Sequence, residues 1–295
     1  MKSVQYLFLL LIAGLAGLSS CKKDNVSGNA DDIPGLGGDE WVNGPVDDWL
    51  FTNYTQVYNV DVKYKWSQTE LSELNKFVVP VDEAQVIPVM TAIKDIWVTP
   101  YEQEAGGNFM KQYMPRFIIL FGSPSYNSDG SFTLGQAEGE GRILLFDLNN
   151  FRSKGMPGYE PVDSLTVKEM FHTIEHEFGH TLHFNIMYPV EFKTITGGYT
   201  SNWNNNTNAQ AREQGFISNY AMNGPDDDFV ETIAFLLVEG QSWFQAMLAT
   251  IESDEGRTKL QQKAAMVEDY YHNAWNINFR SLQTRTRAAI IAYTK

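Results

Sequence analysis

Residues 172–183 read His-Thr-Ile-Glu-His-Glu-Phe-Gly-His-Thr-Leu-His and hold four of the five histidines of the chain. Apolar residues keep a helical period from Ser164 to Phe184, which predicts one helix over this stretch. Its centre, His176-Glu177-Phe178-Gly179-His180, is an H-E-x-x-H pattern. Histidines four residues apart lie on one helix face, about 6 Å apart along the axis, so both can reach one metal ion. About 0.005 such matches are expected by chance in this composition, so the pattern indicates a metal site.

The cysteine count narrows the kind of metal site. The chain has a single cysteine, which excludes Cys-based zinc sites and a disulfide framework. We therefore predict Zn²⁺ held by His176 and His180, with Glu177 beside the metal-bound water as the general base. His183 lies about 10 Å along the helix from His176, so it can join them as a ligand only if the helix breaks. A packing or pocket-lining role is the expectation for His183.

A catalytic zinc site needs a third protein ligand, and a second predicted helix offers one. Residues 225–231 read Pro-Asp-Asp-Asp-Phe-Val-Glu. A proline followed by acidic residues is typical of a helix start, because the N-terminal turn favours negative charge. Without the H-E-x-x-H pattern, the acidic triplet would be interpreted as a solvated helix start. Next to that pattern, it is a candidate source of the third ligand.

These motifs together resemble gluzincin-type zincins: H-E-x-x-H, then Tyr220-Ala221, a turn, and Asp-Asp-Phe-Val-Glu. In that family one acid binds zinc, and a second acid four residues later holds a ligand histidine. The resemblance implies that Asp227 is the ligand and Glu231 the supporting acid. Asp replaces the commoner Glu at the ligand position, so Glu231 as the ligand stays open. Tyr220 matches the tyrosine that stabilises the oxyanion in related zincins, with an ordinary buried tyrosine as the alternative. Trp203 lies between the two motifs, and an exposed loop position is the expectation for it, with lining of the cleft as the alternative.

Composition limits the class of protein. The chain has 295 residues and a formal charge of −14, which argues against a nucleic-acid partner. Its 43% hydrophobic and 13% aromatic residues suffice for a sizeable core. Global disorder is thereby excluded.

The amino terminus has the three-part build of a secretory signal peptide, predicted for residues 1–20. Its end, Leu18-Ser19-Ser20-Cys21, resembles a bacterial lipobox, which implies cleavage before Cys21 and lipidation of that residue. Residues 21–47, rich in Gly, Asp and Asn, are predicted to be a flexible tether. The Lys22-Lys23-Asp24 sequence loosely resembles a signal for the outer face of the outer membrane. We therefore expect a cell-envelope lipoprotein held in the lipid bilayer of the outer membrane by acyl chains, and whether it faces the cell surface stays open.

Residues 48–295 are predicted to form one α+β domain. Short strands are expected at 59–66, 116–122 and 142–147 in one sheet, and helical spacing covers 81–97. After Gly215 the chain is predicted to be mostly helical. The resemblance implies a zincin-like fold, in which a small sheet precedes the active-site helix and a helical C-terminal half.

The whole pattern resembles zinc metallohydrolase lipoproteins associated with outer-membrane nutrient-import systems. This resemblance implies an envelope-anchored zinc metallohydrolase, most simply a peptidase acting on peptides or proteins, with an import complex as a further partner. The alternative is a non-catalytic accessory lipoprotein that uses the same fold for binding. A helical core with surface histidines and no metal is the third interpretation. Glu177 favours the enzyme, because a purely structural metal site needs no base.

Overall fold

The computed structural model describes residues 42–65, 77–126, 132–133, 135–137 and 141–295. Contacts divide the chain into Met1–Asn43 and Gly44–Lys295, and the description that follows concerns the second unit. The predicted signal segment, Cys21 and most of the predicted tether lie outside the described residues. Helix α2 begins at Pro45, so the last three residues of the predicted tether, 45–47, are helical.

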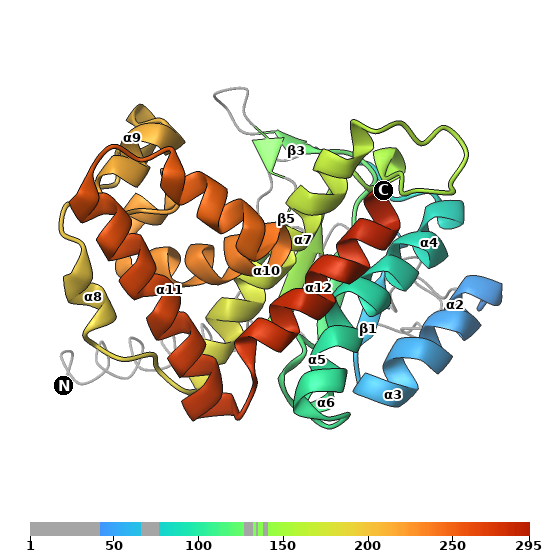
Figure 1. Ribbon diagram of the computed structural model, residues 1–295. Coiled ribbons are helices and arrows are strands. Elements are labelled where there is room, and N and C mark those ends of the chain that lie inside the picture. Colours follow the sequence, from blue (N-terminus) through green and yellow to red (C-terminus); the bar gives the residue numbers. More distant parts are fainter. Residues whose placement is uncertain (1–41, 66–76, 127–131, 134, 138–140) are drawn as a thin grey trace, which may run out of the picture. The chain divides into compact units, whose positions relative to one another are not determined.

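In the first half of the unit helical segments precede the first strand and separate it from the second, and helices dominate the second half (Figure 1). The α-helices are α2 (Pro45–Leu50), α3 (Gln56–Tyr58), α4 (Glu83–Ile93), α5 (Thr99–Ala105), α6 (Phe109–Tyr113), α7 (Asp163–Asn185), α8 (Phe192–Ile195), α9 (Asn208–Glu213), α10 (Pro225–Ala249), α11 (Asp254–Trp275) and α12 (Phe279–Thr294). The strands are β1 (Asp61–Lys63), β2 (Phe117–Leu120), β3 (Ser125–Tyr126), β4 (Phe132–Thr133), β5 (Gly135–Ala137) and β6 (Arg142–Leu145). The predicted α+β composition is confirmed.

The main sheet has the strand order β1-β2-β6-β5. The pairs β1/β2 and β2/β6 are parallel, and the edge strand β5 is antiparallel to β6. A parallel pair needs a long crossover connection, and α4 to α6 supply it between β1 and β2. The helical spacing predicted over 81–97 falls in this crossover, on α4 and the π-helical turn Lys94–Val98 that follows it.

Both faces of the sheet are covered. Ile118 and Leu120 of β2 point into the main core, whereas Ile119 between them packs in a smaller cluster with Phe121 and Leu144. Side chains alternate across a strand, so a strand buried on both faces is apolar throughout. This explains why the predicted strands at 116–122 and 142–147 are short, continuous apolar runs.

Helix α7 matches the predicted helix over 164–184 to within one residue at each end. Its main neighbour is α10, which lies against it along much of its length (Figure 1). Gly179 makes this approach possible, because a Cβ at that position would lie 2.9 Å from Cγ1 of Val230 on α10. The two helices that carry the predicted metal-site residues are therefore held at close range.

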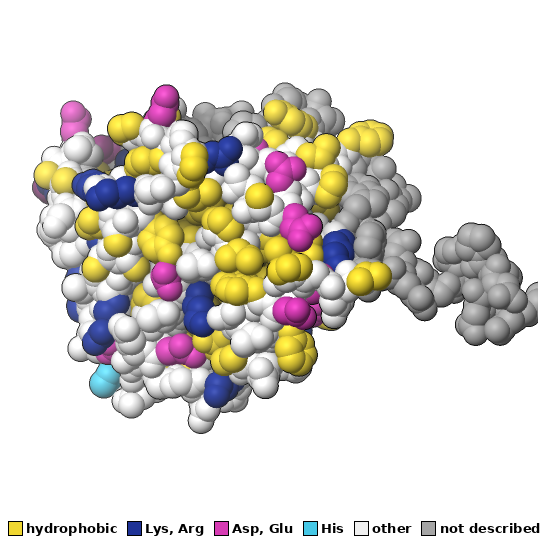
Figure 2. All heavy atoms as spheres, turned by 90° about the vertical axis from the view of Figure 1, so that its right-hand side faces the viewer, with side chains coloured by type: hydrophobic (Ala, Val, Ile, Leu, Met, Phe, Trp, Pro, Cys, Tyr) yellow, Lys and Arg dark blue, Asp and Glu magenta, His cyan; other side chains and the backbone are white. Residues whose placement is uncertain are grey.

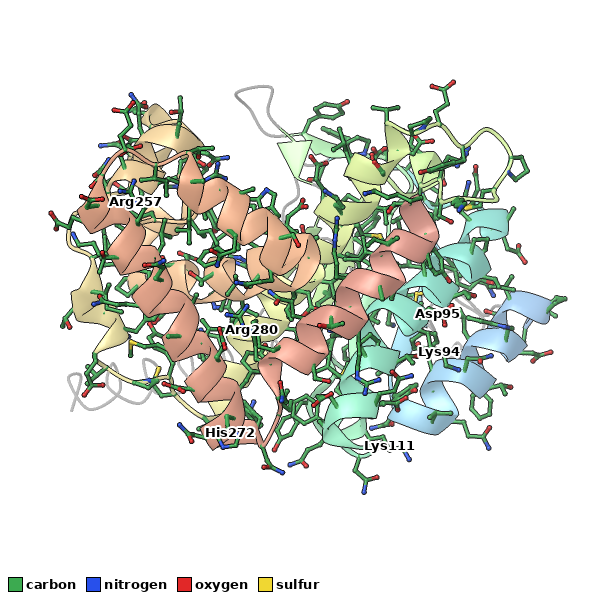
Figure 3. The ribbon with its side chains drawn as sticks, viewed as in Figure 1. Lys94, Asp95, Lys111, Arg257, His272 and Arg280 are labelled. Carbon is green, nitrogen blue, oxygen red and sulfur yellow. The ribbon has the colours of Figure 1, made fainter. Side chains whose placement is uncertain are left out.

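Helices α10, α11 and α12 confirm the predicted helical C-terminal half. His272, the histidine outside the cluster of four, is exposed on α11 (Figure 3). On the face shown in Figure 2, hydrophobic side chains lie among acidic and basic ones. Within the part of the chain that the structure describes, no helix combines the length and the apolarity needed to cross a bilayer.

Candidate metal centre

The three consecutive aspartates at the start of α10 point in three directions, because successive helix residues are rotated by about 100°. Asp226 lies near the surface, 3.1 Å from Nζ of Lys193. Asp228 is fully buried and pairs with the equally buried Lys263 at 2.5 Å. Asp227 alone faces the histidines of α7. The acidic triplet is therefore more than a solvated helix start, since its members have different partners.

Asp227 lies close to both histidines of the H-E-x-x-H motif. Its Oδ1 is 3.8 Å from Nε2 of His176 and 3.5 Å from Nε2 of His180. All three candidate ligand atoms lie within 4.8 Å of one another. Bond lengths of about 2.0–2.2 Å to a tetrahedral zinc ion place ligand atoms roughly 3.4 Å apart, so this set fits zinc. Burial raises the pKa of Asp227, but contacts with His180 and Asn223 and the charges of the histidines outweigh it, leaving the pKa below its usual value.

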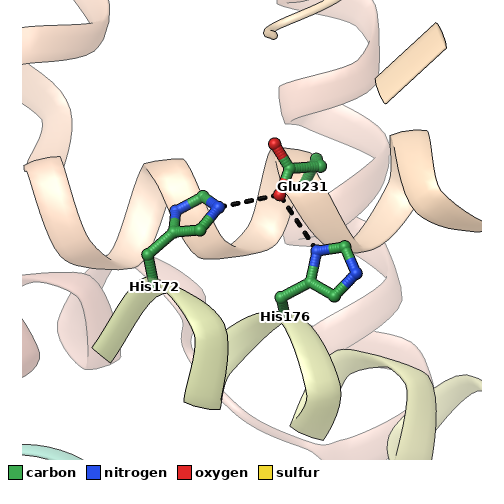
Figure 4. Close-up of side chains that lie close together, drawn as sticks. All are labelled: His172, His176 and Glu231. Atoms are coloured by element: carbon green, nitrogen blue, oxygen red, sulfur yellow. Dashed lines mark hydrogen bonds and ion pairs between the residues drawn. The ribbon is translucent and has the colours of Figure 1, made fainter. Parts of the chain in front are cut away.

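Glu231 lies one turn further along α10 and forms a second cluster (Figure 4). Its Oε1 is 2.7 Å from Nε2 of His172 and 3.0 Å from Nδ1 of His176, and its Oε2 accepts a hydrogen bond of 2.5 Å from Oγ of Ser218. These are hydrogen-bond lengths, shorter than the separation of two ligands on one zinc ion. Burial raises the pKa of Glu231, but the charges and hydrogen bonds of His172 and His176 lower it far more, so it stays well below its usual range.

The two motif histidines present the same ring nitrogen toward Asp227. Nδ1 of His176 is hydrogen-bonded to Oε1 of Glu231, and Nδ1 of His180 is 2.9 Å from Nε2 of His183. Burial and the neighbouring His180 lower the pKa of His183 to about 4, so the neutral His183 ring can accept this hydrogen bond. Both motif histidines thus direct Nε2 toward Asp227 while Nδ1 has another partner, and a partner on the second nitrogen is what orients a metal-binding ring. His183 has the packing role expected for it and also contacts His180.

Glu177 and Tyr220 lie beside the cluster. Among the described residues, neither the Glu177 carboxylate nor the Tyr220 hydroxyl has a hydrogen-bond partner. The Tyr220 ring centroid is 5.7 Å from that of His176, and Trp203 packs edge-on against Tyr220 at 4.9 Å. Burial and the nearby carboxylates raise the pKa of Tyr220 to about 12, so it remains a hydrogen-bond donor at neutral pH. Trp203 is half-buried in a short 3-10 helix and packs on Tyr220, so the expectation of an exposed loop is wrong.

Sequence reasoning missed two partners of Glu231. His172 precedes His176 by four residues, so helical spacing alone could have placed it on the same face. Ser218 precedes Glu231 by 13 residues and carries no local signal. Its hydroxyl also accepts a hydrogen bond from the backbone N–H of Ala221 at 3.1 Å, which ties Glu231 to the segment carrying Tyr220. Only the packed fold reveals this link.

Comparisons with known proteins show the family of the chain. A sequence family described as "Putative zinc-binding metallo-peptidase" matches residues 39–280. The chain belongs to this family. A comparison with curated proteins finds no match.

One solved structure is similar to this chain, and the similarity extends over most of both proteins. It is the crystal structure of "a putative zinc-binding metallo-peptidase" from Bacteroides caccae, with a TM-score of 0.68 and 28% sequence identity. The match covers 84% of this chain and 91% of that chain. Zinc is thus the metal named both for the family and for the solved relative.

Proposed function

We propose that the protein is a zinc-dependent peptidase in which His176, His180 and Asp227 hold the ion. The observation that carries this proposal is the convergence of the two Nε2 atoms and Oδ1 of Asp227, at separations of 3.5 and 3.8 Å between nitrogen and oxygen. Two imidazoles and one carboxylate are a common ligand set of catalytic zinc, with the fourth position left for water. Membership of the metallo-peptidase family supports the same assignment.

In this proposal Glu231 supports the metal site without binding the ion. Its two short contacts to imidazole nitrogens, 2.7 Å and 3.0 Å, occupy Oε1 with hydrogen bonds. A carboxylate bonded to Nδ1 fixes the ring orientation and raises the basicity of the opposite nitrogen. Glu231 therefore keeps Nε2 of His176 directed toward Asp227.

The chemistry divides between the metal and the side chains around it. When bound, zinc supplies Lewis acidity, which makes water acidic near pH 7 and polarises a carbonyl group. Glu177 accepts a proton from the attacking water and delivers it to the nitrogen of the leaving amine. The Tyr220 hydroxyl donates a hydrogen bond to the oxygen that gains negative charge as the peptide carbonyl is attacked. Among the described residues neither the Glu177 carboxylate nor the Tyr220 hydroxyl has a hydrogen-bond partner, so neither must break a hydrogen bond to do this.

The Glu177→Gln variant tests this proposal. We expect its zinc content, measured by inductively coupled plasma mass spectrometry, to be unchanged. Its rate of peptide hydrolysis should fall by about 10²- to 10⁴-fold, the usual contribution of a general base. Glu255→Gln is the control, because Glu255 is exposed on α11. Equal activity in wild type and Glu177→Gln would contradict the mechanism. Zinc binding without hydrolysis of any peptide by the wild type would favour the non-catalytic accessory lipoprotein.

We also propose that the protein is a lipoprotein of the cell envelope, anchored in the outer membrane and exposed at the surface. The lipobox-like Leu18-Ser19-Ser20-Cys21 sequence supports the anchor. Cys21→Ser should release the protein from the membrane fraction or leave it unprocessed. Intact anchoring of that variant would assign attachment to the apolar segment instead.

Service to a nutrient-import complex is the proposed role of the anchored enzyme. It rests on the resemblance of the sequence motifs alone. Crosslinking at the surface of intact cells, followed by mass spectrometry, should recover an outer-membrane transporter. Recovery of the protein with no transporter partner would contradict this role.

A further inference from the structure

A cavity of about 480 Å³ opens between α7 and α10, one helical turn from His176. Ligand pockets in proteins commonly have volumes of about 300–1,000 Å³, so this one can hold a large side chain. It is lined by Lys168, Glu169, His172, Thr173, Phe235, Val238 and Glu239. None of these residues is assigned to metal binding or proton transfer above. Its proximity to His176 suggests that it belongs to substrate recognition.

The charges in the cavity compensate one another. Nζ of Lys168 donates to both carboxylate oxygens of Glu239, at 2.8 and 2.7 Å. Arg287 approaches the same carboxylate at 4.0 Å, and Glu169 is exposed at the edge of the cavity. The Thr173 hydroxyl donates to the backbone oxygen of Glu169 at 3.1 Å. A charged ligand group would have to compete with these pairs, which favours an uncharged ligand.

An aromatic wall completes the cavity. The Phe235 ring stacks on Trp243, with centroids 5.2 Å apart and an interplanar angle of 8°. It also meets the ring of His172 nearly edge-on, at 4.5 Å and 65°. Val238 adds a buried aliphatic surface. Aromatic rings favour offset-stacked and edge-to-face neighbours, so this wall suits another aromatic ring.

The cavity is within reach of a peptide bound at the metal centre. The ring centroids of His172 and His176 are 6.5 Å apart. An extended peptide advances about 3.3–3.6 Å per residue, so two residues cover that separation. We propose that the cavity is a substrate subsite that takes a bulky uncharged side chain, aromatic by preference, from a residue within two positions of the cleaved bond. The cleavage part of this inference rests on the proposed peptidase function.

Filling the cavity tests the subsite. Thr173→Trp places an indole at its wall, and Phe235→Ala removes the aromatic surface. Thr258→Trp is the matched control, because Thr258 is an exposed helical threonine on α11 with the same hydroxyl-to-backbone bond, to Asp254 O at 2.8 Å. Thermal unfolding of each variant verifies that it is folded. The binding probes are N-acetyl-phenylalaninamide and N-acetyl-alaninamide, whose binding is measured by saturation-transfer NMR. A mixed peptide library measures the cleavage preference.

We expect the phenylalanine probe to bind the wild type and the Thr258→Trp variant, and to bind both cavity variants at least about tenfold more weakly. In the library, aromatic residues should be enriched within two positions of the cleaved bond for the wild type only. Equal probe binding by wild type and Thr173→Trp would overturn the subsite, as would hydrolysis without this preference. Cavity-dependent probe binding without hydrolysis of any peptide would uphold the ligand class and overturn the peptidase instead.

Discussion

Two clusters of side chains between α7 and α10 share His176 but differ in their spacing. The first joins Nε2 of His176 and of His180 to Asp227 at 3.8 and 3.5 Å. The second joins Nδ1 of His176 and Nε2 of His172 to Glu231 at 3.0 and 2.7 Å. Both contain two imidazoles and a carboxylate, so residue types alone do not separate them. Spacing does, because the first set is wide enough for an ion and the second is closed by hydrogen bonds.

The difference shows how the imidazole of His176 connects the proposed metal ligands to Glu231, the residue that supports them. His176 uses one nitrogen in each cluster, so Glu231 can set the orientation of the ring without competing for the ion. Asp227 and Glu231 are one turn apart on α10, and each meets a different nitrogen of the same ring. The four-residue spacing of the two acids therefore matches the two sides of one histidine.

The largest effect is expected for the histidines that the clusters do not share, His180 of the first cluster and His172 of the second. His180→Ala removes a proposed ligand and should abolish stoichiometric zinc binding. His172→Ala removes a partner of Glu231 and no proposed ligand, so it should keep about one zinc ion per chain. His272→Ala, at an exposed site on α11, is the control. Zinc analysis by plasma mass spectrometry decides, and loss of zinc in His172→Ala with retention in His180→Ala would reverse the assignment.

The two acids should differ by a smaller margin. Asp227→Ala should weaken zinc binding by more than about 100-fold, whereas Glu231→Gln should stay within the ~10- to 100-fold range typical of residues that hold a ligand. Competition with a chromophoric chelator measures both affinities. The reverse order would move the ligand to Glu231.

Ser218 should have the smallest effect. Ser218→Ala removes one of three hydrogen bonds to Glu231, so zinc affinity should fall by less than about tenfold. Ser253→Ala is the matched control: it removes the cap of α11, a 3.0 Å bond to the backbone N–H of Gly256, and should cost about 1 kcal/mol of stability without changing zinc affinity. Urea unfolding and chelator competition provide the two readouts. Equal effects of both variants on zinc affinity would show that Ser218 acts through general stability.

Much of the site could be predicted from the sequence because its signals are local. The H-E-x-x-H spacing and the Asp227 to Glu231 spacing each depend on a single helix, and helical geometry fixes which side chains share a face. The boundaries of α7 follow from its apolar period for the same reason. The proposed roles of Glu177, Tyr220 and the ligands remain predictions, now with a geometry that accommodates them.

The rest depends on contacts between distant segments. The parallel pairing of β1 with β2 follows from a crossover through α4 to α6, which the strand patterns do not encode. Ser218 meets Glu231, and Phe235 meets His172, only after α10 packs on α7. Gly179 carries a detectable signal, since a glycine inside a helix often marks close packing, but its neighbour Val230 could not be named.

The position of the ion tests the central claim most directly. Diffraction data collected on both sides of the zinc absorption edge, from crystals of the zinc-loaded protein, locate the metal without reference to activity. The proposed ligand set predicts one anomalous peak about 2.0–2.2 Å from Nε2 of His176, Nε2 of His180 and a carboxylate oxygen of Asp227. A peak between His172, Nδ1 of His176 and Glu231 would contradict it.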